Sequence, residues 1–239
     1  MKNPTAAMLV IGDEILSGRT RDANTHYLAG ELTKVGIDLK EIRVVSDDHA
    51  AIIEAVRALS ARYDHLFTSG GIGPTHDDIT ADAVAEAFGV TITHRADAMA
   101  LLQSHYERQG QEFNEARQRM ARIPEGAELI DNPISVAPGF ILKNVHVMAG
   151  VPTIFEAMLS SVLPRLTGGA PLLSQSLRVM RGEGEIAAEF GRLAADFPDL
   201  TMGSYPFQQN GAFGTNLVIR GTDAARLDAA MLRLVGLFG

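Results

Sequence analysis

Over the first two thirds of this chain, short apolar runs alternate with segments whose apolar residues recur at helical spacing. The apolar runs predict buried strands at residues 6–11, 37–45 and 65–68. The helical spacing predicts helices at residues 24–35 and 50–61, and a third helix that starts at Ile79. Strands that alternate with helices of this length indicate a parallel sheet with helices on both faces.

The segment 90–125 has a more polar pattern. It predicts helices at residues 96–109 and 113–120, followed by a turn at Pro124-Glu125-Gly126. It also contains Arg95, Arg108, Arg117, Arg119 and Arg122. We interpret these arginines as a solvated face in preference to a cluster that serves a ligand. After a loop at 132–140, one strand is expected at 141–148 and a helix at 154–163.

The last part of the chain has its own pattern. Residues 166–171, which include Gly168-Gly169, predict a linker. After it, strands are expected at 172–180, 200–206 and 215–220, helices at 183–197 and 224–237, and a turn at Gln209-Asn210-Gly211. This order predicts a small α+β domain. We therefore expect two domains, at residues 1–168 and 169–239.

A glycine-rich loop follows the third predicted strand. Gly70, Gly71 and Gly73 fall within four positions, before a predicted helix. Backbone N–H groups in such a turn, together with the helix dipole, favour an anion, and glycine lets the backbone approach a ligand closely. The same loop contains Asp77 and Asp78. Because carboxylates repel a phosphate unless a divalent cation lies between them, the loop predicts a metal-bridged phosphate ester. The plainer interpretation is a tight turn with an acidic helix start.

Two further acidic clusters follow predicted strands. Gly12-Asp13-Glu14 ends the first strand, and Asp47-Asp48 follows the second. Open α/β sheets bind ligands at the carboxyl ends of their strands, so these residues are candidates for the same site. Either aspartate of the second cluster could instead cap the next helix.

Composition narrows the choice of partners and compartment. The 21 basic and 29 acidic residues give a net charge of −8, which argues against a nucleic-acid-binding face. With no cysteine, the chain has no disulfide, thiolate nucleophile or cysteine-based zinc site. No apolar run approaches the roughly 18 residues of a membrane span, and no signal peptide is visible. We expect a cytoplasmic protein without membrane contact.

Four motifs occur together and in order. They are Gly12-Asp13-Glu14, Ser69 through Thr80, Asn132-Pro133 with Ala137-Pro138-Gly139-Phe140, and Gly150-Val151-Pro152. Over about residues 5–168 the chain resembles the MoaB/Mog-like molybdopterin-binding domain family, as found at the front of CinA-like proteins and fused to FAD synthases. The resemblance implies a three-layer α/β/α fold with a mostly parallel sheet. It does not extend to the C-terminal deamidase domain of CinA-like proteins, so that activity is not implied.

The resemblance also implies an activity. Similar proteins are metal-dependent pyrophosphatases that act on ADP-ribose or FAD, so we expect a hydrolase of a nucleoside-diphosphate-linked compound. Asp47 and Asp78 would hold Mg²⁺, Mn²⁺ or Co²⁺, and Asp77 would position water or act as base. The remaining candidates for ligand contacts are Gly12, Glu14, Asn24, Thr68, Ser69, Gly70, Gly71, Gly73, Thr75, Pro138 and Gly139.

Two alternatives stay open at this point. One is molybdopterin binding or adenylylation with the same loop, and the other is a non-catalytic module that binds a pterin or nucleotide. The chain departs from the family at Ser69, where Thr is common, and at Ile134-Ser135-Val136, where Gly-Thr often follows Ile. Family likeness also leads us to expect a homo-oligomer.

Overall fold

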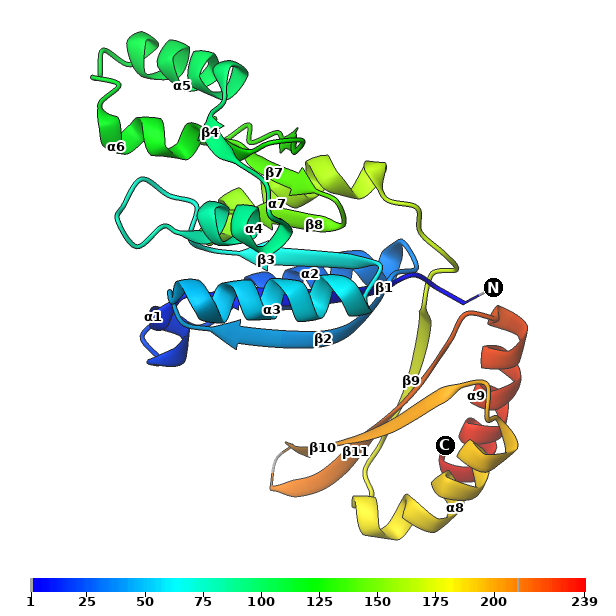
Figure 1. The fold of residues 1–239 in the computed structure, drawn as a ribbon. Coiled ribbons are helices and arrows are strands. Elements are labelled where there is room, and N and C mark those ends of the chain that lie inside the picture. Colours follow the sequence, from blue (N-terminus) through cyan, green and yellow to red (C-terminus); the bar gives the residue numbers. More distant parts are fainter. Residues whose placement is uncertain (1, 210) are drawn as a thin grey trace. The chain divides into compact units, whose positions relative to one another are not determined.

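The computed structural model describes residues 2–209 and 211–239 (Figure 1). The chain forms two compact units, of which the first ends at Gly169 and the second begins at Ala170. No helix among the described residues is long and apolar enough to cross a membrane.

The first unit is built on a six-stranded sheet with the order β2-β1-β3-β8-β7-β6. Its strands are β1 (Thr5–Ile11), β2 (Asp38–Val45), β3 (His65–Ser69), β6 (Glu128–Ile130), β7 (Gly139–Leu142) and β8 (Val145–Met148). Strands β2, β1, β3 and β8 are parallel, whereas β7 runs antiparallel to both β8 and β6. The mostly parallel sheet expected from the sequence is therefore confirmed.

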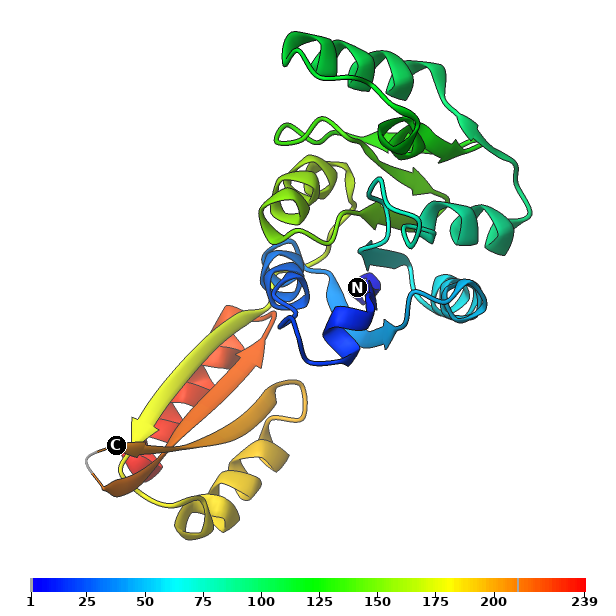
Figure 2. The same cartoon turned by 90° about the vertical axis from the view of Figure 1, so that its left-hand side faces the viewer.

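Helices cover both faces of this sheet. Helices α2 (Asn24–Lys34) and α7 (Pro152–Val162) lie side by side on one face, and α3 (His49–Arg62) and α4 (Thr80–Phe88) on the other (Figure 2). Strand β1 explains this, because its side chains alternate in direction. Met8 and Val10 belong to the core with α2 and α7, while Leu9 and Ile11 belong to the core with α3 and α4. The three-layer α/β/α fold is confirmed.

The polar segment between α4 and the sheet forms a small subdomain of its own. It contains β4 (Ile92–His94), α5 (Ala96–Arg108), α6 (Glu115–Gln118), the 3-10 helix η1 (Arg119–Ala121) and β5 (Arg122–Pro124). Strands β4 and β5 pair antiparallel to each other. The helical segments were predicted, but β4, β5 and β6 were not. Each is only three residues long, which is too short to show an alternating pattern.

The single strand expected at residues 141–148 is wrong. The segment contains the end of β7, a tight turn at Lys143-Asn144, and β8, which returns antiparallel to β7. Lys143 has φ +54°, a left-handed conformation that ends the strand. The Asn144 side chain donates to the carbonyls of Ser60 and Tyr63, both at 2.9 Å, and so anchors the turn to the end of α3.

The second unit is a small α+β domain, as predicted. Its elements are β9 (Leu173–Val179), α8 (Glu183–Asp196), β10 (Thr201–Gln209), β11 (Ala212–Gly221) and α9 (Ala224–Phe238). The antiparallel sheet has the order β10-β11-β9, and both helices pack on one face of it through Leu217 and Ile219. Strands β10 and β11 are longer than expected. In the predicted turn between them, Asn210 lies outside the described residues.

Candidate functional site

A cavity of about 580 Å³ lies where the parallel strands of the first unit end. Its walls are the loops that follow β1, β2, β3 and β8, which is the usual ligand position in open α/β sheets. The volume suits a small-molecule ligand. The structure brings the following predicted site residues together in its lining: Glu14, Asp47, Gly70, Gly71, Gly73, Asp77 and Asp78.

The glycine loop passes too close to its neighbours for side chains. Gly70 has φ +108°, and a Cβ there would lie 2.2 Å from the Ile11 carbonyl oxygen. Gly71 has φ +69°, and a Cβ there would lie 2.1 Å from the Thr80 hydroxyl. That buried hydroxyl donates to the Gly70 carbonyl at 3.0 Å, and the Thr80 N–H donates to the Gly71 carbonyl at 3.0 Å. Glycine is therefore required at both positions.

The backbone N–H groups of the loop differ in availability. The Gly70 N–H donates to the Met148 carbonyl at 3.2 Å, so the prediction that this amide holds a phosphoryl oxygen is corrected. In the part of the chain that the structure describes, the N–H groups of Gly71 and Gly73 have no acceptor. Both residues line the cavity, so these two donors are available to an anionic ligand.

Helix α4 starts later than the sequence suggested. It begins at Thr80, so residues 72–79 form a loop between the glycines and the helix. Asp82 in the first turn of α4 is ion-paired with Arg122 at 2.8 Å. The charge of the Asp82 carboxylate is therefore already compensated, and the expected contribution of the helix dipole to an anion site at the glycines stays a prediction.

Asp47 and Asp48 have separate roles. Asp48 is the N-cap of α3, with Oδ1 accepting from the Ala51 N–H at 2.9 Å. Asp47 does not cap the helix and instead lines the cavity. Its Oδ2 accepts a hydrogen bond from the Asp13 N–H at 3.0 Å. Burial raises the pKa of Asp47, and the nearby carboxylates of Asp13, Glu14 and Asp77 raise it further.

This crowding of carboxylates suits a cation. Repulsion that raises the pKa of Asp47 would be relieved by a bound divalent ion. Among the described residues, however, no group of three or more His, Asp or Glu side chains is placed to hold a metal. Mg²⁺ is often bound through one or two carboxylates together with the phosphate of a substrate. Asp47 and Asp78 both line the cavity, so they are the predicted residues that would hold such a cation beside a phosphate ligand.

Several predicted contact residues lie behind the cavity and do not line it. Asn24 is buried, and its Nδ2 donates to the Ser69 hydroxyl and to the Gly150 carbonyl, both at 2.7 Å. Asn24 thus ties the loop after β3 to the loop after β8. Thr68 is also fully buried. The predicted residues that do not line the cavity are Gly12, Asn24, Thr68, Ser69, Thr75, Pro138 and Gly139.

Sequence reasoning missed some lining residues. Arg19 and Thr20 follow the short helix α1 (Asp13–Leu16) and complete the wall beside Glu14. Asn132 and Ser135 line the opposite wall, where the Asn132 Nδ2 donates to the Ser135 hydroxyl at 2.6 Å. Asn132 belongs to a motif that the sequence singled out, whereas Arg19 and Thr20 sit in an irregular segment that carried no pattern.

Comparison with known proteins assigns both units of the chain to known families. Residues 7–168 match the family described as "Probable molybdopterin binding domain", and residues 171–239 match the one described as "FAD synthase, middle domain". A probable FAD synthase of Caenorhabditis elegans is 32% identical and covers 96% of this chain. A CinA-like protein of Citrifermentans bemidjiense is 40% identical over 68% of this chain. The chain spans 49% and 40% of the length of these two relatives, respectively.

A solved structure supports the same family assignment. The protein CinA of Thermoplasma acidophilum, of unknown function, is 32% identical, with a TM-score of 0.63. The similarity covers 69% of this chain and 99% of that one. Since the matched segment 7–168 is more than half of the sequence, the chain belongs to the MoaB/Mog-like molybdopterin-binding domain family, in its CinA-like form.

Proposed function

We propose that the cavity of the first unit binds a nucleoside-diphosphate-linked compound and hydrolyses its diphosphate bond. One observation carries the proposal: available N–H donors and crowded carboxylates line the same cavity. The N–H groups of Gly71 and Gly73 suit phosphoryl oxygens, and the carboxylates need a cation beside such a ligand. ADP-ribose and FAD are the substrates to test first, and one relative is named as a probable FAD synthase.

The residues of the chain divide the work between binding and proton transfer. Gly71 and Gly73 donate to the phosphoryl oxygens and orient the diphosphate. Asp47 and Asp78 would hold Mg²⁺, Mn²⁺ or Co²⁺, and such an ion would supply Lewis-acid activation of the phosphoryl group and of water. Asp77, which also lines the cavity, positions the attacking water and accepts its proton.

The test is AMP release from ADP-ribose and from FAD, measured with each of the three metals and with EDTA. We expect metal-dependent release that is lost in Asp78→Asn. Asp48→Asn is the matched control, because Asp48 caps α3 and does not line the cavity. If folded protein releases no AMP from either compound with any of the metals, the proposal is wrong.

A second candidate function is binding of a pterin or nucleotide without hydrolysis, either as a non-catalytic module or for adenylylation of molybdopterin. It is favoured by the finding that no three acidic or histidine side chains among the described residues are placed to hold a metal. The family description, which names molybdopterin, also supports it. A module without turnover would keep its ligand in Asp78→Asn. Adenylylation would yield AMP esterified to the pterin in place of free AMP.

A further inference from the structure

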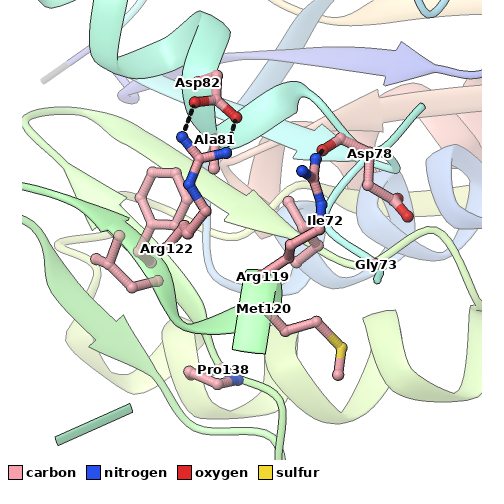
Figure 3. Close-up of a pocket in the computed structure, with 12 residues that line it drawn as sticks. Ile72, Gly73, Asp78, Ala81, Asp82, Arg119, Met120, Arg122 and Pro138 are labelled. Atoms are coloured by element: carbon pink, nitrogen blue, oxygen red, sulfur yellow. Dashed lines mark hydrogen bonds and ion pairs between the residues drawn. The ribbon is translucent and has the colours of Figure 1, made fainter. Parts of the chain in front are cut away.

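A small hollow adjoins the main cavity, and Figure 3 shows the residues that line this hollow. Gly71, Gly73 and Asp78 line both spaces. The far wall of the hollow comes from the polar subdomain, where η1 contributes Arg119 and Met120. Arg119 is thus a basic residue that lines the hollow and not the main cavity, and it comes from a segment that the sequence suggested was only a solvated face.

The Arg119 side chain points at the glycine loop with little to compensate its charge. Its Nη2 donates to the Asp78 backbone carbonyl at 3.4 Å, which is a long hydrogen bond. Its Nε is buried and has no acceptor among the described residues. Arg119 is half-buried, and burying part of a guanidinium without an anion to pair with it is costly, so the position requires an explanation.

The neighbouring Arg122 lines the same hollow, and its positive charge is paired with a carboxylate. Its guanidinium forms a fork with both carboxylate oxygens of Asp82 in α4 (Figure 3). This ion pair fixes the start of β5 against α4 and so holds the adjacent η1 in place. Arg119 therefore points at the loop from a segment that is anchored independently of any ligand.

The acidic lining of the main cavity indicates why a phosphate ligand would need a cationic group such as Arg119. Four carboxylates line that cavity, those of Glu14, Asp47, Asp77 and Asp78, against the single guanidinium of Arg19. A phosphate group would be repelled from this lining unless cationic groups face it on the loop side. Among the described residues of the loop, the N–H groups of Gly71 and Gly73 are available as donors, but they carry no charge.

We propose that Arg119 binds the phosphate group of the ligand together with the N–H groups of Gly71 and Gly73. The inference rests on the proposed function for the identity of the ligand class, a nucleoside diphosphate. A guanidinium suits this role because its planar fork can donate two hydrogen bonds to phosphate oxygens. Its bond to the Asp78 carbonyl also holds the loop that carries Asp77 and Asp78. Arg119 is thus a binding residue that contacts both the ligand and the catalytic loop.

The test is direct binding of ADP, measured by calorimetry with Mg²⁺ present, since the carboxylates of the cavity need a cation beside a phosphate, and again with EDTA. Arg119→Gln keeps a donor for the Asp78 carbonyl but removes the charge. We expect its Kd for ADP to rise about tenfold or more, as for loss of a charged hydrogen bond. Arg119→Lys restores the charge without the fork, and its Kd should lie between the two. Arg108→Gln is the control, because it removes the same charge from an exposed position on α5.

Adenosine is the second probe, because it lacks the phosphates, and all variants should bind it as the unmodified protein does. The inference is overturned if Arg119→Gln binds ADP within twofold of Arg108→Gln, if Arg119→Lys is no better than Arg119→Gln, or if ADP does not bind at all. Should Arg119→Gln fail to fold, a Kd of Arg119→Lys equal to that of the unmodified protein also overturns it. Because binding of ADP is measured without turnover, a failed hydrolysis assay contradicts only the proposed function.

Discussion

Thr75 holds the carboxylate of Asp78 by two hydrogen bonds to one oxygen. The Thr75 N–H donates to Oδ2 at 2.8 Å, and the Thr75 hydroxyl donates to the same oxygen. Asp78 is in this way fixed within the loop, and its Oδ1 is left without a hydrogen bond from the described residues. Thr75 does not line the cavity, so in the proposed function it would act by positioning Asp78.

This relationship predicts that Thr75→Val lowers activity more than stability. Valine keeps the shape and the N–H but removes the hydroxyl, so Asp78 loses one of its two restraints. We expect kcat/KM for AMP release to fall about tenfold, corresponding to about 1.4 kcal/mol. Thr75→Ser retains the hydroxyl and should stay within about threefold of the unmodified protein. Equal activity of the valine and serine variants would contradict the positioning role of the hydroxyl.

The division of work between Asp47 and Asp48 predicts opposite effects of two neighbouring substitutions. Asp47→Asn removes a partly buried charge that is repelled by Asp13, Glu14 and Asp77. The metal-free variant should therefore unfold at the same temperature as the unmodified protein or higher, and its activity should be lost. Asp48→Ala removes the N-cap of α3 and should cost about 1 kcal/mol of stability while activity is retained. Thermal unfolding with EDTA and the AMP-release assay measure both. An active Asp47→Asn would show that this carboxylate does not hold the metal.

The parts of the fold that the sequence predicted are those determined by local periodicity. Strand β1 is a continuous apolar run that is buried on both faces, and helix α3 packs one apolar face on the core, so their apolar positions reveal them. The β7–β8 hairpin is different, because its turn depends on contacts between Asn144 and the carbonyls of Ser60 and Tyr63. These partners lie more than 80 positions away in the sequence, and nothing near Asn144 indicates them.

The same distinction applies to the site. The glycine loop was predictable because its three glycines and two aspartates lie in one short segment, so the local sequence alone indicates an anion and metal site. Arg119 was not, because the sequence offers five arginines between residues 95 and 122 and no way to rank them. Only the path of η1 brings Arg119 to the loop. Asn24 was expected to contact the ligand, but tertiary structure gives its amide to Ser69 and Gly150 instead.

The close packing of the glycine loop predicts that Gly71→Ala is strongly destabilising. A Cβ would lie 2.1 Å from the Thr80 hydroxyl at φ +69°, so steric overlap adds to backbone strain, and we expect a loss of about 2–5 kcal/mol. Gly110→Ala is the matched control, since Gly110 has φ +64° but a Cβ added there would meet no atom within 4 Å. It should cost only about 1–2 kcal/mol. Urea unfolding of the two variants measures the difference, and equal losses would show that the clash relaxes.

His146 lies in strand β8 of the parallel sheet and is buried. Its Nδ1 has no hydrogen-bond partner among the described residues. Its ring stacks on Phe67 with centroids 4.7 Å apart, and its Nε2 lies 3.4 Å from Nδ1 of His65. Burial, with smaller effects from the charges of His65 and Arg165, lowers the pKa of His146 to about 3. The neutral form is therefore the one that the folded protein accommodates.

This predicts that acid destabilises the protein partly through His146. Between its usual pKa of 6.5 and the folded value of about 3, the unfolded chain binds a proton that the folded chain does not, so stability falls as the pH decreases. The contribution of this one group is up to about 1.4 kcal/mol per pH unit. His146→Phe should keep the stacking on Phe67 and flatten the dependence of the urea unfolding free energy between about pH 6.5 and 4.5. His26→Phe, at an exposed position in α2, should leave the slope unchanged. Because carboxylates contribute equally to all three proteins, parallel curves for the unmodified protein and His146→Phe would show that His146 does not titrate in this range.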